Sequence, residues 1–373
     1  MEDTTTVQWA EPQFDPQSEA GRAFEQDRQR VEHMLAEARD LPALVAAAEQ
    51  IQTQVHQLVD RTEVAESMTL FISILNDMLT RRVIDVVASG CDFDGVRWCW
   101  ISLGSEGRQE QTLSSDQDNG IIFVSDAPAD AVREQMLPLA RRINDALDAC
   151  GFPLCAGNVM ASNPEWCLSL QEWKERFSSW IIEGDPMALL NSSIFFDLRP
   201  LHGDFGLAVE LADWLGREGS ANPRFLFQMA ANALHRRPPL GIFHKFVLEK
   251  EGKYPHTIDL KVNAATLFID AARIYGLAAR GHASNTGQRF ALAVAARRLH
   301  PDDVEKWVEA FYFIQMLRLK HQQDCYKRGR EMNNHIDPDE LDDADTDRLQ
   351  AALRQARALQ KRLSLDYPGS RSV

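Results

Sequence analysis

A glycine–serine pair and two closely spaced aspartates are the residues of this chain best suited to chemistry. Gly104 and Ser105 directly follow an apolar, aromatic segment, and Asp116 and Asp118 directly precede a second apolar segment. Glycine allows a sharp backbone turn, and the serine offers a hydroxyl and an amide where a short helix would begin, which suits a phosphate group. Residues i and i+2 of a strand point to the same side, about 6.6 Å apart between Cα atoms. The two carboxylates can therefore converge on one cation.

The spacing of the two aspartates favours a metal ion. Two like charges about 4 Å apart repel each other by roughly 4 kcal/mol at an effective dielectric constant of about 20, so such a pair shifts its pKa values or recruits a counterion. Mg²⁺ suits the pair, because it prefers oxygen ligands and completes its shell with waters and substrate phosphates. Arg108 could stabilise charge on a transferring phosphoryl group. The alternative is an ordinary hairpin with aspartates that cap a turn, but the joint order of strand, GS, DxD and strand favours the site.

The elements that would position these residues predict an α+β protein. Helical spacing of apolar residues runs through 18–89, strand and helix patterns alternate in 90–205, and 210–365 is again helical, while 1–17 reads as a flexible tail. Within the middle region we expect one helix and four short strands, at 129–149 and at 96–103, 119–125, 153–161 and 193–198. An acidic stretch, 336–347, is expected to be a solvated connector.

Composition excludes several classes of partner. The 373 residues carry a formal net charge of −15, which disfavours binding to nucleic acid, because that binding depends on Lys and Arg. The six cysteines show no CxxC pairing and the first twenty residues lack a basic start followed by an apolar run, so we expect a cytoplasmic protein. The longest apolar runs fall far short of the roughly 20 residues that span a bilayer, so no membrane partner is expected.

The segment GSEGRQEQTLSSDQDNGIIF (104–123) resembles the signature of the DNA polymerase beta-like nucleotidyltransferases. The closest resemblance is to nucleotidyltransferases related to the PII-protein uridylyltransferases. It continues through 75–87, 155–173, 185–204 and 235–243, and the segments 257–277, 313–322 and 333–341 resemble the companion helical domain, usually described as substrate-binding. The resemblance implies N-terminal helices, a nucleotidyltransferase core with a small mixed sheet, and a C-terminal helical bundle.

The resemblance also implies roles for particular residues. Asp116 and Asp118 would bind Mg²⁺ and act in catalysis, and the nucleotide-binding set would be Gly104, Ser105, Gly107, Arg108, Ser115 and Asn158. Most members of the superfamily add a third carboxylate from a later strand. The expected strand 153–161 has no acid, so Asp197 is the best remaining candidate for a catalytic third carboxylate, although a strand-end aspartate followed by Leu-Arg-Pro more often serves a turn or a salt bridge.

Other residues have two explanations each. Asn158 could contact a base or ribose, or could simply form a loop after Gly157. Arg318 and His321 extend an apolar helical stripe and could bind phosphate or a substrate protein, or could form a buried ion pair. Asp259 and Lys261 read as part of an internal charge network.

The expected function is Mg²⁺-dependent transfer of a nucleoside monophosphate from UTP or ATP to an acceptor, with a protein hydroxyl as the acceptor that the resemblance implies. A noncatalytic nucleotide-binding regulator is one alternative. An adenylyltransferase that acts on another protein or on a small molecule is the other. Nothing in the spacing distinguishes the two nucleotides.

Overall fold

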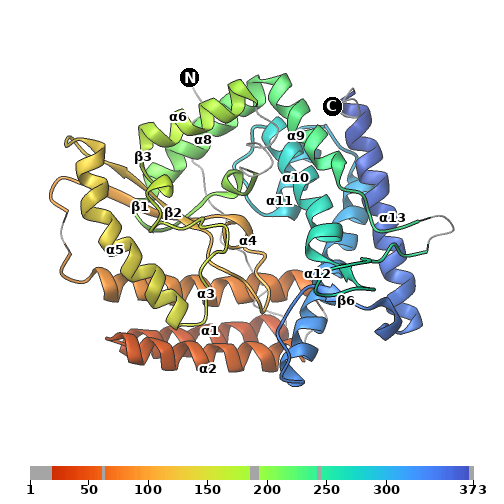
Figure 1. Cartoon of the computed structure of the whole chain (residues 1–373), viewed down its shortest axis with the longest axis horizontal. Helices are drawn as coiled ribbons and strands as arrows, with labels where there is room; N and C mark the ends of the chain where they lie inside the picture. Colours follow the sequence, from red (N-terminus) through yellow and green to blue (C-terminus); the bar gives the residue numbers. More distant parts are fainter. Residues whose placement is uncertain (1–18, 61–63, 92, 185–192, 242–244, 369–373) are drawn as a thin grey trace.

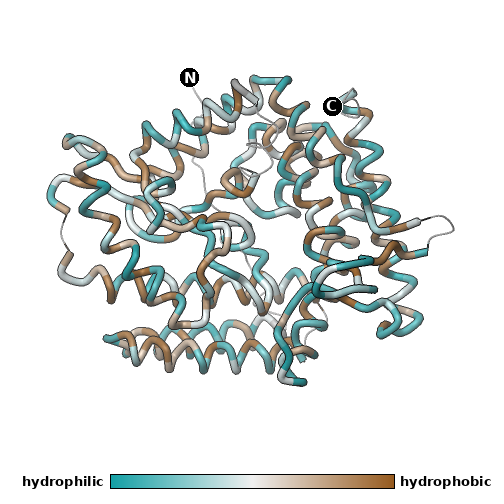
Figure 2. The backbone as a smooth tube through the Cα atoms, viewed as in Figure 1, coloured by the Kyte–Doolittle hydropathy of each residue, from teal (hydrophilic) through white to brown (hydrophobic). Residues whose placement is uncertain are grey.

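The computed structural model describes residues 19–60, 64–91, 93–184, 193–241 and 245–368, and the expected tail 1–17 lies outside them (Figure 1). The N-terminal region forms the three helices that its apolar spacing predicts: α1 (Glu19–Glu37), α2 (Leu41–Val59) and α3 (Ala65–Ala88). Asp40 caps α2 by accepting a hydrogen bond from the amide of Ala43 at 3.0 Å. The residues of α1 and α2 alternate between hydrophilic and hydrophobic, as expected for helices with one solvent-facing side (Figure 2).

A small mixed sheet forms the centre of the next region, in agreement with the predicted α+β class. Its strands are β1 (Arg97–Ser102), β2 (Asn119–Val124), β3 (Cys167–Ser169) and β4 (Arg199–Gly203). The order is β3-β2-β1-β4, with β2 and β3 parallel and the other neighbours antiparallel. The helices of this region are α4 (Gly104–Gly107), α5 (Ala129–Ala149), α6 (Leu170–Glu183) and α8 (Phe205–Ala221), with a 3₁₀ turn η1 at Pro164–Trp166.

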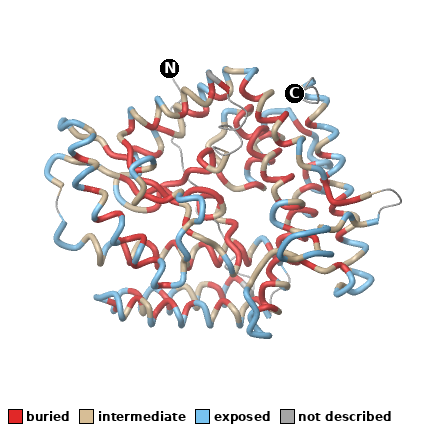
Figure 3. The backbone as a smooth tube through the Cα atoms, viewed as in Figure 1, coloured by how far each residue is buried: buried red, intermediate tan, exposed pale blue. Residues whose placement is uncertain are grey.

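Both faces of the sheet are covered by helices. Trp100 and Ile121, which are opposite each other in the β1–β2 register, pack into a core shared with α1, α2, α3 and α5. Cys99 and Ile122 are also opposite each other and pack into the core that includes α6, α8 and the C-terminal helices. Buried residues accordingly concentrate in the sheet and on the inner sides of the helices around it (Figure 3).

Two of the predicted strands are wrong. Residues 153–161 form an irregular loop, in which Asn158 adopts a left-handed conformation (φ +55°) that breaks extended pairing. Residues 193–197 form the 3₁₀ helix η2 (Ser193–Asp197), and β4 begins only at Arg199. Neighbouring residues of a strand point to opposite faces, whereas Phe195 and Phe196 both pack into the core that includes α6 and α8.

The C-terminal region is helical, as predicted. It contains α9 (Pro223–His235), α10 (Thr266–Ala278), α11 (Thr286–Ala295), α12 (Pro301–Lys327) and α13 (Asp343–Asp366). A two-stranded ribbon joins β5 (Ile258–Asp259) to β6 (His335–Ile336), a π-helical turn η4 covers Lys261–Ala265, and a 3₁₀ turn η5 covers Pro338–Glu340. The acidic stretch is more than a connector, since Asp337 caps η5 and Asp342 caps α13.

Helix α12 contacts the N-terminal helices and so connects the C-terminal region to them. Near its C-terminal end, Gln323 hydrogen-bonds His56 of α2 at 2.5 Å, and Lys327 pairs with Asp60 at 2.6 Å. No helix among the described residues is long and apolar enough to cross a lipid bilayer.

Candidate functional site

Asp116 and Asp118 lie in the segment that leads directly into β2. The carbonyl of Asp118 accepts a hydrogen bond from the amide of Leu103 at 2.8 Å, which continues the β1–β2 ladder by one step. Between the two acids, the side chain of Gln117 is buried and donates to the carbonyl of Asn144 on α5 at 3.0 Å. Because neighbouring side chains of extended backbone alternate, the two carboxylates share the side opposite to Gln117.

Asp116 and Asp118 form no ion pair with any of the residues that the structure describes. The described residues contain no salt bridge to either of them within 4.0 Å. Burial, and then the charge of Asp116, raise the pKa of the Asp118 carboxyl to about 7. The pair is therefore an uncompensated acidic site that a cation would stabilise.

A third metal-ligating group lies beside the pair. The Cys155 thiol donates to Oδ1 of Asp118 at 3.4 Å, and one ligand atom each from Asp116, Asp118 and Cys155 lie within 4.8 Å of one another. Two carboxylate oxygens and one sulfur in this arrangement fit a divalent cation, so these three residues are the ones that would hold it. The sequence did not indicate Cys155, because a single cysteine in a segment without acids has no metal-ligand spacing of its own.

The glycine–serine turn borders the carboxylates. Strand β1 ends at Ser102, and Gly104 begins α4 with φ +53°, a conformation that favours glycine. A Cβ at Gly104 would lie 2.6 Å from Oδ2 of Asp118. Gly104 and Ser105 are the first two residues of α4, and the first backbone amides of a helix have no partners within the helix.

Gly107 has a packing role that the sequence did not reveal. A Cβ at this position would collide with the carbonyl oxygen of Asp197 and would lie 2.8 Å from that of Ser102. Its predicted contact with the nucleotide remains a prediction. The residue instead allows η2 to pack directly against α4.

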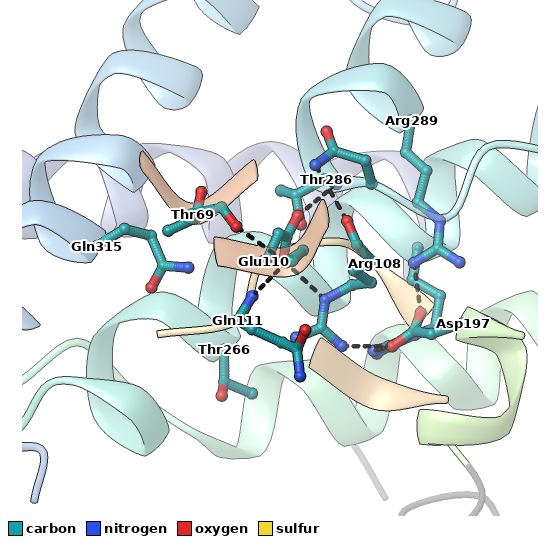
Figure 4. Close-up of polar contacts among 12 residues, drawn as sticks. Thr69, Arg108, Glu110, Gln111, Asp197, Thr266, Thr286, Arg289 and Gln315 are labelled. Carbon is teal, nitrogen blue, oxygen red and sulfur yellow. Dashed lines mark hydrogen bonds and ion pairs between the residues drawn. The ribbon is translucent and has the colours of Figure 1, made fainter. Parts of the chain in front are cut away.

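Arg108 and Asp197 belong to a buried ion cluster, which we define as Arg108, Glu110, Asp197, Arg273 and Arg289 (Figure 4). Oδ2 of Asp197 accepts from Arg108 at 2.5 Å and from Arg273 at 2.7 Å, and Oδ1 accepts from Arg289 at 2.5 Å. Burial alone would raise the pKa of Asp197, but the three guanidinium groups hold it well below its usual range. The second oxygen of Glu110 accepts from the amide of Thr286 at 2.7 Å, so the cluster also fixes the start of α11.

This placement does not fit the predicted catalytic role of Asp197. Both of its oxygens are occupied by arginines, and it is in neither of the two possible metal-holding groups among the described residues. The expected strand that would have carried it to the aspartate pair is the 3₁₀ helix η2. Arg108 likewise uses Nε and Nη1 within the ion cluster, so it reaches Asp118 only through its electrostatic field.

Asn158 and Ser115 have structural roles in the loops around the site. The carbonyl of Asn158 accepts from Trp166 at 3.1 Å and its amide donates to the carbonyl of Cys155 at 2.9 Å, which closes a turn. The hydroxyl of Ser115 donates to the carbonyl of Thr112 at 3.3 Å. The Asn158 side chain is exposed, so its predicted contact with a nucleotide remains a prediction.

The C-terminal region brings positive charge to the same area. Arg318 on α12 is 6% exposed, donates from Nε to Asn334 at 2.9 Å and has no carboxylate partner within 4.0 Å among the described residues. Burial lowers its pKa to about 10, and the fields of Arg108 and Glu110 also act on it. Lys261, in the π-helical turn, is exposed and is one of two cations whose fields lower the pKa of Asp118. This position of Lys261, next to the site rather than in an internal network, was not predicted.

His321 lies one helical turn beyond Arg318. Its Nε2 is 3.1 Å from the side-chain oxygen of Asn333 and 3.6 Å from the Cys325 sulfur. Arg318 and His321 therefore contact two neighbouring residues, Asn334 and Asn333, of the loop before β6, and their predicted contact with a substrate remains a prediction.

Comparison with known families agrees with the two-region organisation. Residues 49–187 match the family model described as "Putative nucleotidyltransferase DUF294". Residues 223–367 match the model described as "Putative nucleotidyltransferase substrate binding domain". No curated protein matches the chain significantly. The aspartate pair, Gly104 and Cys155 all fall within the first matched region, whereas Lys261 and Arg318 fall within the second.

Proposed function

We propose that this chain, whose two regions match a nucleotidyltransferase family and its substrate-binding domain, uses a divalent cation to transfer a nucleoside monophosphate from an NTP to an acceptor. One observation carries the proposal. Within the part of the chain that the structure describes, Asp116 and Asp118 form no ion pair, while the neighbouring Asp197 and Glu110 are paired with arginines. Uncompensated carboxylates beside a glycine turn suit a cation that arrives with a triphosphate.

Each group of residues would have its own role in binding the cation and the triphosphate. Asp116 and Asp118 hold the cation, for which Mg²⁺ is the expected choice and which neutralises phosphate charge when bound. The Gly104–Ser105 turn borders the triphosphate, since it adjoins Oδ2 of Asp118. Lys261 adds positive charge from the helical region.

We further propose UTP as donor and a protein hydroxyl as acceptor, by resemblance to the PII uridylyltransferases. The net charge of −15 supports an acceptor with a basic surface, because unlike charges accelerate encounter. An adenylyltransferase would differ only in the nucleotide consumed.

A noncatalytic nucleotide-binding regulator is the second candidate. The placement of Asp197 favours it, because the residue that could have served as third carboxylate is held by three arginines. Such a protein would bind NTP with a metal ion and release no pyrophosphate.

Binding of UTP and ATP, measured by calorimetry with and without Mg²⁺, tests the proposal. We expect metal-dependent binding that Asp116→Asn and Asp118→Asn each weaken by about tenfold or more, equal to 1.4 kcal/mol or more. Asp126→Asn, an exposed acid just beyond β2, is the matched control and should bind as the wild type does. Unchanged binding in the double Asn variant would remove the site assignment.

Pyrophosphate release then separates the two candidates. An enzyme releases pyrophosphate when a suitable acceptor is supplied, and the nucleotide consumed identifies the donor. A regulator binds the nucleotide with the same metal dependence and leaves it intact.

A further inference from the structure

Cys155 is held in place beside the aspartate pair by its own loop. The amide of Gln117 donates to the carbonyl of Pro153 at 3.0 Å, and the amide of Asn119 donates to the carbonyl of Val159 at 3.1 Å. These two bonds join the loop to the segment that carries the aspartates, on either side of Cys155. Backbone hydrogen bonds on both sides of Cys155 therefore fix its place in the chain next to the aspartates.

The surroundings of Cys155 differ from those of the other cysteines. Cys99, Cys150 and Cys167 are buried in the apolar cores, as structural cysteines commonly are. Cys155 is half-buried, and its thiol contacts a carboxylate that has no cationic partner. None of the six cysteines forms a disulfide.

We propose that Cys155 is the third protein ligand of the metal site, so that the site without nucleotide binds a divalent ion that accepts sulfur, such as Zn²⁺, more tightly than Mg²⁺. The inference rests on the proposed function, since it concerns the cation that Asp116 and Asp118 would hold. Thiolate is a soft ligand that favours Zn²⁺, whereas Mg²⁺ demands oxygen ligands. A sulfur donor within 4.8 Å of both carboxylates therefore increases the affinity for Zn²⁺ and does not increase the affinity for Mg²⁺.

Calorimetric titration of the full chain with Zn²⁺ and with Mg²⁺, without nucleotide, measures this selectivity directly. Cys155→Ser is the informative change, because serine keeps a hydrogen-bond donor to Asp118 and removes only the sulfur. We expect Zn²⁺ affinity to fall by about tenfold or more, in line with the loss of a metal-site partner, and Mg²⁺ affinity to stay within about twofold. Cys155→Asp should do the opposite and raise Mg²⁺ affinity, since it supplies a third oxygen ligand.

A spectroscopic probe gives a readout that does not depend on activity. Cd²⁺ bound to a thiolate produces a charge-transfer band in the ultraviolet. All samples carry Cys91→Ser, because Cys91 is exposed and could bind Cd²⁺ by itself. The band should appear in this background and disappear when Cys155→Ser is added, while thermal unfolding shows that both proteins are equally folded.

The outcomes separate the two proposals. If Cys155→Ser keeps the Cd²⁺ band and the Zn²⁺ affinity, while Asp118→Asn loses metal binding, the cysteine is not a ligand and the aspartate site stands. If the wild-type protein binds none of the three ions, with or without NTP, both this inference and the proposed function are wrong.

Discussion

Asp118 and Asp197 lie on either side of α4, and their negative charges are compensated in different ways. Gly104 adjoins Asp118, and Gly107 adjoins the backbone of Asp197, so the four-residue helix separates the two acids. Asp197 is fully buried and accepts hydrogen bonds from three arginines. Asp118 is half-buried, is contacted by a thiol, and has its pKa raised to about 7.

This difference indicates that Asp197 has a structural role and that Asp118 is suited to bind a ligand. A buried charge must be compensated, either by the protein or by something that binds. The protein compensates Asp197 with arginines from three places: the loop after α4, α10 and α11. Asp197 therefore attaches the helical region to the sheet region. The compensation of Asp118 is left to a ligand.

The largest effect in this comparison is expected from Asp197→Asn. Removing the only carboxylate shared by three buried guanidinium groups leaves their charges unpaired, which should cost about 3–5 kcal/mol in the free energy of unfolding. Urea unfolding followed by circular dichroism measures this loss. Asp270→Asn is the control, because Asp270 pairs with Arg273 alone and is 17% exposed, and it should cost about 1 kcal/mol or less.

Equal and small losses in these two variants would mean that the ion cluster does not hold the regions together. Where Asp197→Asn is too unstable to purify, Arg289→Met keeps a long side chain and removes one of the three arginines. It should then show an intermediate loss of stability.

Alanine substitutions at the two glycines of α4 test the same difference between Asp118 and Asp197. Gly107→Ala should cost about 3 kcal/mol, because the new methyl group meets two backbone carbonyls that cannot move aside. Gly104→Ala should cost only about 1–2 kcal/mol for the positive φ. Its methyl group meets the Asp118 side chain, so it should also weaken metal-dependent NTP binding. Urea unfolding and calorimetry of both variants check these expectations.

A reversed pattern, with Gly107→Ala stable and Gly104→Ala binding NTP normally, would show that α4 does not separate a structural acid from a ligand-binding one.

The sequence predicted the fold better than it predicted the contacts of charged residues. The apolar spacing predicted the helices α3 and α5. The order of the glycine–serine pair and the two aspartates indicated that Gly104 would lie near Asp118. Phe195 and Phe196 both pack into the core that includes α6 and α8, which a helical turn allows and a strand does not, so tertiary packing overrode their strand preference. No local pattern indicates that Arg273 and Arg289 meet Asp197, because these partners are 76 and 92 residues away in the chain.

The contacts of several predicted site residues could not be read from the sequence for the same physical reason. Arg108, Asp197 and Gly107 have side chains or positions compatible with catalysis, and only tertiary packing shows that they are already engaged. Cys155 was missed because it contacts Asp118 across 37 residues of chain.

Stability as a function of pH tests a third buried acid, Glu106. Burial raises the pKa of its carboxyl from 4.5 to about 8, so the folded protein keeps a proton that the unfolded chain releases. Unfolding therefore releases a proton between about pH 5 and 8, and stability falls as pH rises through this window. Glu106→Gln removes this contribution and keeps an acceptor for the Ser102 hydroxyl, so its stability should fall less steeply.

Asp118 contributes to the same window with the same sign, so part of the slope should persist in Glu106→Gln and be removed by adding Asp118→Asn. Asp197 acts in the opposite direction, because its lowered pKa makes stability fall only under acid conditions. An identical slope in the wild type and both variants between pH 5 and 8 would show that these acids are not protonated in the folded state.

The smallest effect is expected from Lys261→Met, which changes binding and not stability. Lys261 is exposed, and the methionine keeps an unbranched apolar side chain without the charge, so the free energy of unfolding should change by less than about 0.5 kcal/mol. The lysine field acts on Asp118 across the boundary between the two regions. NTP affinity should therefore fall about fivefold, or about 1 kcal/mol, with less loss for a nucleoside monophosphate, which carries less charge.

Ionic strength distinguishes this electrostatic role from a structural one. Charges near the surface are screened by salt, so the difference between the wild type and Lys261→Met should shrink as NaCl rises from 0.05 to about 1 M, where the Debye length is about 3 Å. Lys306→Met, an exposed lysine on α12, is the control and should bind NTP as the wild type does at every salt concentration. A loss in Lys261→Met that does not change with salt would mean that the helical region shapes the site without supplying charge to it.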